Sequence, residues 1–241
     1  RGLPVGSKQN QEGRIFLETQ PWAIMSGVAN LERGKVTMDS VEKYLATPHG
    51  IILQQPAFTQ FSLHLGECTS YPPGLKENAG IFCHPNPWAV IAECKLKRAE
   101  KAWNYWLTIC PSWREKVSEV HRQEPYVYAQ MIAGPDHPHF GEAKNSWLTG
   151  TASWALISAT QWILGIRPDY QGLIVDPCIP SDWKGFQVQR WFRGVQFTIV
   201  VERKPNEKYL LKVDGKTISG KTIPIFSPGS EHLVEVILGE D

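Results

Sequence analysis

The sequence predicts a mainly α-helical domain followed by an all-β domain, an antiparallel β-sandwich. Up to about residue 170, apolar residues recur at helical spacing, and Pro, Asn or Asp stands where helices would begin. Beyond that point, short β-rich runs are separated by Gly, Pro, Asn and Asp, which is typical of a sandwich. Because the pattern changes near residue 170, we place a helical domain over residues 1–170 and a β domain over residues 171–241.

The helical domain is predicted to contain five helices. Asp39 or Ser40 is expected to begin the second helix, and Asn86 to cap the third. The fifth has the length of a membrane span, but its Thr, Ser and Gln side chains make insertion unfavourable, so we expect a helix buried within protein. The five segments are residues 15–30, 38–47 and 86–108, a helix from 125 to 132, and residues 146–165.

The β domain is predicted from six short runs, several of which alternate between apolar and polar residues. Such alternation indicates strands with one buried and one exposed face. The runs cover residues 173–177, 186–192, 195–202, 209–213, 221–226 and 232–238.

Composition limits the function class. With 42% apolar and 20% charged residues and a net charge of +1, neither nucleic acid nor a membrane surface is an expected partner. The chain has ten tryptophans, and a high tryptophan content is common in carbohydrate-active proteins of this size. Most of these side chains are nevertheless expected to fill the core. Five cysteines without a CxxC pair predict buried free thiols and a cytoplasmic location. The chain lacks a signal-peptide pattern and an initiator Met, so we expect it to begin inside a longer gene product.

The segment Tyr71-Pro-Pro-Gly-Leu-Lys-Glu-Asn-Ala-Gly-Ile-Phe-Cys-His84-Pro-Asn-Pro-Trp88 combines a turn with ionic, amide and imidazole groups. Its prolines and glycines force an extended entry and a tight turn. A surface turn explains the Pro, Gly, Lys and Asn residues, but it does not explain why His84 directly follows an apolar run. We interpret the segment as the polar wall of a ligand pocket.

Two further segments carry polar groups. The first, Gly141 to Thr151, predicts either an anion site at the start of a helix or plain helix capping by Asn145 or Ser146. The second contains two Tyr and Gln130, which suit sugar hydroxyls, and then Asp136-His-Pro-His139. We expect no metal site at these histidines, because no matching cluster stands at ligand spacing. Phosphate-loop, GxGxxG and GxSxG motifs are absent from the sequence.

Several segments together resemble glycoside hydrolase family 94, the cellobiose, chitobiose and related disaccharide phosphorylases. The resemblance covers nearly the whole chain but only the C-terminal third of such a protein. It implies the end of an (α/α)6 barrel followed by a β-sandwich. The segments are 71–88, Glu124-Pro-Tyr-Val-Tyr-Ala-Gln, Asn145-Ser-Trp-Leu-Thr-Gly-Thr-Ala-Ser-Trp, Gln161-Trp-Ile-Leu-Gly-Ile-Arg-Pro-Asp-Tyr and Asp176-Pro-Cys-Ile-Pro, with the opening Arg1-Gly-Leu-Pro-Val-Gly-Ser and Gly13-Arg-Ile-Phe-Leu.

The resemblance implies phosphorolysis with inversion, in which phosphate replaces the activated water of an inverting hydrolase. Inorganic phosphate is then a co-substrate, and no cofactor is expected. The matching phosphate-binding positions are His84, Thr149 and Gly150, and the matching sugar-binding positions are Glu67, Tyr71, Lys76 and Gln130. The family's general acid, an Asp, lies upstream of the region matched here, so we expect no catalytic acid in this chain.

Cellobiose is the expected disaccharide, because a Tyr at position 71 resembles the glucose-accepting members of the family more than the N-acetylglucosamine ones. Chitobiose, cellobionic acid and other β-linked glucans are the alternatives. Family members are commonly homodimers, so we expect either a homodimer or association with the missing N-terminal part. A different class of function is a non-catalytic carbohydrate-binding or assembly fragment, in which Trp183 and Trp191 form a sugar platform; we favour the sandwich core for both side chains.

Overall fold

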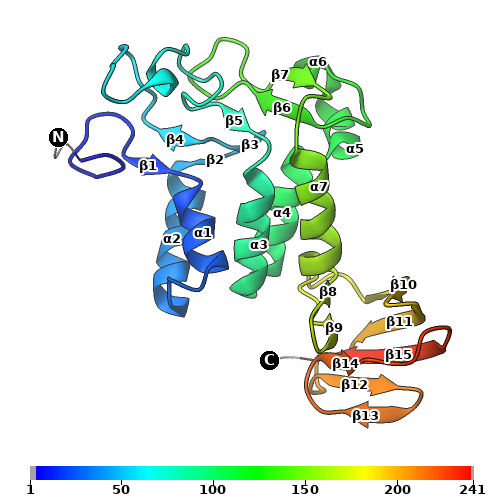
Figure 1. The fold of residues 1–241 in the computed structure, drawn as a ribbon. Helices are drawn as coiled ribbons and strands as arrows, with labels where there is room; N and C mark the ends of the chain where they lie inside the picture. The colour runs from blue at the N-terminus through cyan, green and yellow to red at the C-terminus, as the bar shows by residue number, and fades with distance from the viewer. Residues whose placement is uncertain (1–3, 240–241) are drawn as a thin grey trace. The chain divides into compact units, whose positions relative to one another are not determined.

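The computed structural model describes residues 4–239, so the first three residues of the opening motif lie outside the described residues. The chain divides into two compact units, one ending at Ser158 and the other beginning at Ala159. Helices dominate the first unit and sheets the second, as the sequence predicts (Figure 1). The domain boundary near residue 170 stays a prediction.

Helix α3 lies at the centre of the first unit. Eight of its ten residues are buried, because it packs against α1, α2, α4 and α7. An apolar surface all round is typical of a helix enclosed by other helices. None of the helices within residues 4–239 is both long and apolar enough to cross a membrane. The helices of this unit are α1 (Thr19–Met25), α2 (Leu31–Tyr44), α3 (Asn86–Lys95), α4 (Ala99–Ile109), α5 (Pro111–Arg114), α6 (Ser118–His121) and α7 (Thr151–Ile157).

Short strands and loops gather at one end of α3 and α7 (Figure 1). The three-stranded antiparallel sheet of β5, β6 and β7 carries the Tyr71–Trp88 segment and the polar segment after residue 140 to this end. The strands are β1 (Ile15–Phe16) paired with β4 (Gln54–Gln55), β2 (Ala46–Thr47) paired with β3 (Gly50–Ile51), and β5 (Ile81–Phe82), β6 (Ala129–Ile132) and β7 (Ala143–Ser146).

Two predicted helix starts are wrong. In the segment 15–30, Ile15 and Phe16 pair with β4, and the helix occupies only Thr19–Met25. The second helix begins at Leu31 rather than at Asp39 or Ser40. Asn30 caps it, since the Asn30 side chain accepts a hydrogen bond from Arg33 N at 2.8 Å.

Left-handed backbone conformations change two other predicted helices. Lys97 has φ +60° and divides the segment 86–108 into α3 and α4, and Asn86 lies in the first turn of α3 rather than at its cap. Asn145 and Trp147 have φ +55° and +70°, so α7 begins only at Thr151. Asn145 and Ser146 lie in β7, and the helix-cap interpretation is wrong for both. A π-helical turn, Ser158–Ile163, follows α7.

The segment 125–132 forms no helix, and its last four residues, Ala129–Ile132, form strand β6. Its short apolar run pairs with β5 on one side and with β7 on the other. Tertiary pairing therefore overrides a run whose periodicity suits either structure.

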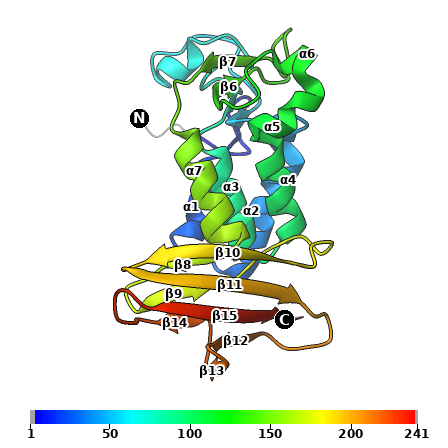
Figure 2. The same cartoon turned by 90° about the vertical axis from the view of Figure 1, so that its right-hand side faces the viewer.

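The second unit contains two sheets that share one hydrophobic core. Figure 2 shows the five-stranded sheet, whose order is β10-β11-β15-β12-β13. All its pairs are antiparallel except β11 with β15, so the wholly antiparallel arrangement is wrong at this pair. Its strands are β10 (Gly185–Phe192), β11 (Val195–Arg203), β12 (Leu210–Val213), β13 (Lys216–Ile218) and β15 (Glu231–Leu238); the other sheet has β8 (Ile166–Pro168), β9 (Gly172–Val175) and β14 (Thr222–Pro224).

Strand alternation decides which side chains enter this core. Phe197 and Ile199 of β11 point inward and are almost completely buried. Trp191 of β10 has the opposite parity to the inward Phe192 and is 64% exposed. The expectation that Trp191 fills the core is therefore wrong.

Glu93 is a fully buried carboxyl group on α3. Its Oε2 lies 2.9 Å from Arg98 Nε, and Arg98 also pairs with Asp39 at 2.7 Å. Burial raises the pKa of Glu93 from 4.5 to about 7, because loss of hydration outweighs the attraction of Arg98. Glu93 is therefore protonated in the folded state over a pH range in which the unfolded chain has lost that proton.

This difference in pKa predicts that stability falls as pH rises from about 4.5 to 7, since the unfolded state binds fewer protons there. At about 1.4 kcal/mol per pKa unit, the loss attributable to Glu93 approaches ~3 kcal/mol. In Glu93→Gln this part of the pH dependence should disappear. Thermal unfolding of both proteins across this pH range measures it; parallel curves for the two would contradict the assignment.

Candidate functional site

The predicted phosphate-binding residues come together at the end of α3 and α7 that bears the short strands. His84 stands in the turn between β5 and α3, and Gly150 immediately precedes α7. A Cβ placed on Gly150 would lie 2.7 Å from His84 Nδ1 and 2.8 Å from His84 Cε1. The imidazole therefore lies directly against the backbone of Gly150, although 65 residues separate the two in sequence.

Aromatic rings hold His84 in this place. The ring centroids of Trp88 and Trp154 lie 5.3 Å and 6.5 Å from that of His84, and 5.8 Å from one another. All three contacts are edge-to-face, an arrangement that aromatic rings favour. The side chain of His84 is only partly buried, so it stays accessible to a ligand.

Thr149 contributes a hydroxyl at the same place. Its Oγ1 accepts a hydrogen bond from Thr151 N at 3.1 Å and contacts Thr151 Oγ1. Thr149 is half-buried and Gly150 is exposed. An imidazole, a hydroxyl and exposed backbone N–H groups are suitable donors to an anion.

The four predicted sugar-binding residues form two hydrogen-bonded pairs. Tyr71 OH donates to Glu67 Oε1 at 2.9 Å, and this bond is the main reason why the pKa of Tyr71 is raised. Lys76 Nζ donates to Gln130 Oε1 at 2.8 Å. Each pair leaves further donors or acceptors for hydroxyl groups of a ligand.

Asn145 joins the second pair. Its Nδ2 donates to Gln130 Oε1 at 2.9 Å, so one amide oxygen binds both Asn145 and Lys76. The pairing of β6 with β7 brings Asn145 opposite Gln130. Sequence reasoning considered Asn145 only as a helix cap, and no sequence signal indicates this contact because it depends on strand register.

Asn78 holds the Tyr71–Trp88 segment from behind and is completely buried. Its Nδ2 donates to the carbonyls of Phe58 and Tyr71 at 2.8 Å and 2.7 Å. Its Oδ1 accepts from Phe58 N at 2.7 Å and from Gln54 Nε2 at 3.1 Å. The Gln54 amide oxygen in turn accepts from Ala79 N at 2.8 Å. Asn78, which the sequence places on a pocket wall, thus positions that wall.

Arg114 is a buried arginine whose charge acts on Cys83 of the Tyr71–Trp88 segment. Arg114 contacts His49 Nδ1 and donates to the Pro48 carbonyl at 3.3 Å. Burial, and then Arg114, lower the pKa of His121 to about 4. Burial likewise raises the pKa of Cys83, the neighbour of His84, to about 12, while Arg114 opposes that change. At neutral pH, His121 and Cys83 are therefore uncharged.

The two histidines of the Asp136–His139 loop contact one another, and His139 contacts Glu142. His139 Nδ1 lies 3.2 Å from Glu142 Oε2, and its ring centroid lies 5.6 Å from that of His137. Across residues 4–239, no group of three or more His, Cys, Asp or Glu side chains is arranged to hold a metal ion.

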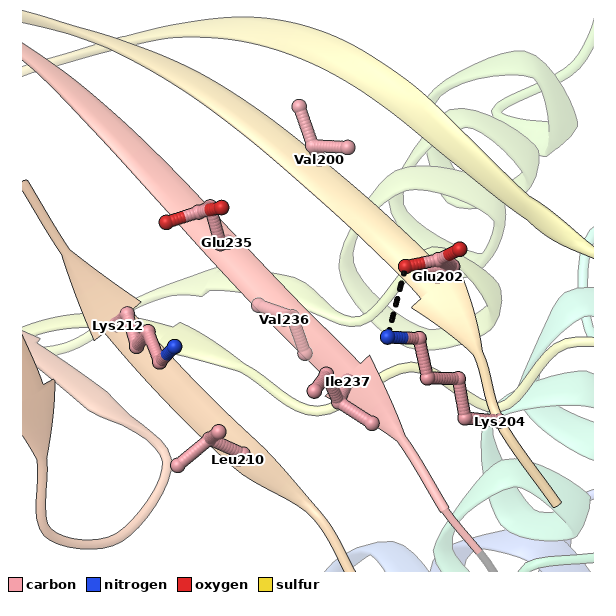
Figure 3. A pocket seen from close by; sticks show the side chains of 8 residues that line it. All are labelled: Val200, Glu202, Lys204, Leu210, Lys212, Glu235, Val236 and Ile237. Carbon is pink, nitrogen blue, oxygen red and sulfur yellow. Dashed lines mark ion pairs between the residues drawn. The ribbon is translucent and has the colours of Figure 1, made fainter. Parts of the chain in front are cut away.

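The second unit contains a hollow that none of the predicted site residues lines (Figure 3). It has a volume of about 170 Å³ on β11, β12 and β15, and an ion pair of 3.4 Å joins Glu202 to Lys204 at its edge. None of the residues that line it is aromatic, so it offers no stacking surface for a sugar ring. They are Val200, Glu202, Lys204, Leu210, Lys212, Glu235, Val236 and Ile237.

Comparison with known proteins identifies the family. The sequence profile of the Glycosyl hydrolase 94 superfamily, catalytic domain, matches residues 1–165. This chain belongs to glycoside hydrolase family 94. The family 94 match contains the whole Tyr71–Trp88 segment and the Thr149–Gly150 pair.

Relatives of this family 94 chain extend the match into the β domain. It is 42% identical to an N,N'-diacetylchitobiose phosphorylase of Vibrio proteolyticus and 39% identical to one of Vibrio furnissii, each over 99% of this chain and 30% of that protein. It is 36% identical to a solabiose phosphorylase of Paenibacillus borealis, over 98% of this chain and 31% of that protein. The chain thus spans about 30% of the length of these relatives.

Proposed function

We propose that the protein to which this chain belongs cleaves a β-linked disaccharide with inorganic phosphate and releases an α-sugar 1-phosphate and a free sugar. The observation that supports this most is the contact between His84 and Gly150 beside the Thr149 hydroxyl. A hydrolase has no need of such an anion site, whereas a phosphorylase needs one. Family membership supports the same reaction.

In the proposed reaction, an oxygen of phosphate forms a bond to the anomeric carbon on the face opposite the leaving group, and the glycosidic bond breaks. A carboxylic acid gives its proton to the leaving oxygen, as in other inverting reactions. We place this acid, an Asp, on the segment upstream of this chain. His84, Thr149 and Gly150 would then orient the phosphate and stabilise its charge.

Glu67, Tyr71, Lys76 and Gln130 are proposed to bind the sugar hydroxyls. Their carboxylate, phenol, ammonium and amide groups are the donors and acceptors that fix a polyhydroxylated ligand. We further propose that α1–α4 and α7 belong to an (α/α)6 barrel completed by the upstream segment. The intact protein is then expected to be a cytoplasmic homodimer.

Two disaccharides have specific support. Cellobiose is favoured by the Tyr at position 71, since a Tyr at this position resembles the glucose-accepting members of the family. N,N'-Diacetylchitobiose is favoured by the names of the two Vibrio relatives, which are 42% and 39% identical to this chain. Both substrates share a β-linked glycosyl unit. They differ at the 2-position of each sugar ring.

The proposal is tested with the protein at its full encoded length. Each disaccharide is supplied with and without inorganic phosphate, and sugar 1-phosphate is measured. Turnover should require phosphate, and His84→Ala should lower kcat/KM for phosphate roughly 10- to 100-fold, the range expected for loss of a charge-assisted hydrogen bond. His139→Ala, in an exposed loop, serves as the control. Equal turnover without phosphate would show a hydrolase instead.

A further inference from the structure

Two large aromatic side chains lie exposed in turns that flank β6, which carries the proposed sugar-binding amide, and β7. Tyr126 is 74% exposed and Trp147 is 68% exposed. Their ring centroids lie 6.3 Å apart with an interplanar angle of 62°. Aromatic side chains of this size usually bury most of their surface, so an exposed pair indicates a binding surface.

The position of Trp147 connects the two halves of the proposed site. It lies in the short connection between β7 and α7, which begins after Ser146 and ends at Gly150. Asn145 binds the amide oxygen of Gln130, while Thr149 and Gly150 lie beside His84. Along the chain, Trp147 therefore lies between Asn145, which contacts the proposed sugar-binding amide, and the proposed phosphate-binding pair Thr149 and Gly150.

The backbone at Trp147 is held in an unfavourable conformation. Its φ of +70° is in the left-handed region, which a bulky residue rarely adopts. Such strain persists only where the surrounding structure imposes it, and it concentrates at ligand-binding positions. The indole of Trp147 is exposed on the surface next to Tyr126.

We propose that Tyr126 and Trp147 form a stacking surface for a sugar ring of the disaccharide substrate. This inference rests on the proposed function. The C–H face of a pyranose packs on an aromatic ring, while Gln130, Asn145 and Lys76 bind hydroxyl groups at its edge. The surface thereby adds affinity for the sugar and leaves the binding of phosphate unchanged.

Kinetics of the full-length protein test the pair. Trp147→Ala is expected to raise KM for the disaccharide roughly tenfold with KM for phosphate unchanged, because an aromatic contact is lost. Trp147→Phe, which keeps a ring, should remain within about threefold of the wild type. Trp113→Ala removes another exposed tryptophan and is the control. An unchanged KM for the disaccharide in Trp147→Ala would overturn the inference.

In the synthesis direction, the same variants show which ring is stacked. A raised KM for the acceptor sugar places the leaving unit on the aromatic pair, and a raised KM for sugar 1-phosphate places the glycosyl unit there. Either result supports stacking. If both constants stay at their wild-type values, the surface does not bind the substrate.

Direct binding separates this inference from the proposed reaction. Cellobiose and N,N'-diacetylchitobiose are titrated into the wild type and Trp147→Ala without phosphate, by calorimetry. Weaker binding to the variant supports the sugar surface even if no phosphorolysis is found. If affinity is equal and the thermal stability of Trp147→Ala and Leu148→Ala falls, the surface packs against polypeptide and the inference is overturned.

Discussion

Replacing Gly150 by alanine is expected to raise KM for phosphate roughly 10- to 100-fold, the equivalent of one lost hydrogen bond to a charged group. The reason is steric. The new methyl group would lie 2.7 Å from His84 Nδ1, so the imidazole would have to move away from the proposed phosphate position. Gly150 has φ −83°, which alanine adopts without strain, so the backbone should stay folded.

The measurement is steady-state kinetics with phosphate and disaccharide varied separately. KM for the disaccharide should change little, and the melting temperature should stay close to that of the wild type. Ala152→Ser, which adds one atom at an exposed neighbouring position of α7, is the matched control. In the double variant with His84→Ala the two effects should not add, because both act on one contact. Full additivity would show that Gly150 acts independently of His84.

Replacing Asn78 by alanine is expected to destabilise the first unit by about 2–4 kcal/mol. The change removes two donated and two accepted hydrogen bonds inside the protein and leaves Phe58 N–H and the carbonyls of Phe58 and Tyr71 without this partner. Buried polar groups that lose their partners cost more than the bonds themselves contribute. Since Tyr71 is held by one of these bonds, KM for the disaccharide should rise as well.

Chemical denaturation measures the loss, with Asn104→Ala as the control because Asn104 is exposed on α4. Asn78→Asp keeps an acceptor but places a carboxylate oxygen against the carbonyls of Phe58 and Tyr71, so it should be at least as unstable as Asn78→Ala. If Asn78→Ala and Asn104→Ala cost the same, Asn78 does not anchor the segment.

The helical part of the fold was predicted least well where backbone conformation depends on distant partners. Residues 125–132 suit either a helix or a strand by periodicity, and pairing with β5 and β7 makes Ala129–Ile132 a strand. The left-handed residues Lys97, Asn145 and Trp147 end or delay helices without any Gly or Pro to signal it. In the β part, all six predicted runs overlap paired strands in order, but the parallel pairing of β11 with β15 has no local signal.

The sequence by itself determined that a helix-rich part precedes a β-rich part, and the resemblance carried by its motifs identified family 94 and seven candidate residues. These are local properties, since they depend on residue types and their spacing. Only the tertiary structure decided that His84 lies on Gly150, that Asn78 anchors a loop, that Asn145 completes the Lys76–Gln130 pair, and that Trp147 and Trp191 face outward. Each of these depends on strand register or on contacts between segments far apart in the chain, which local patterns do not encode.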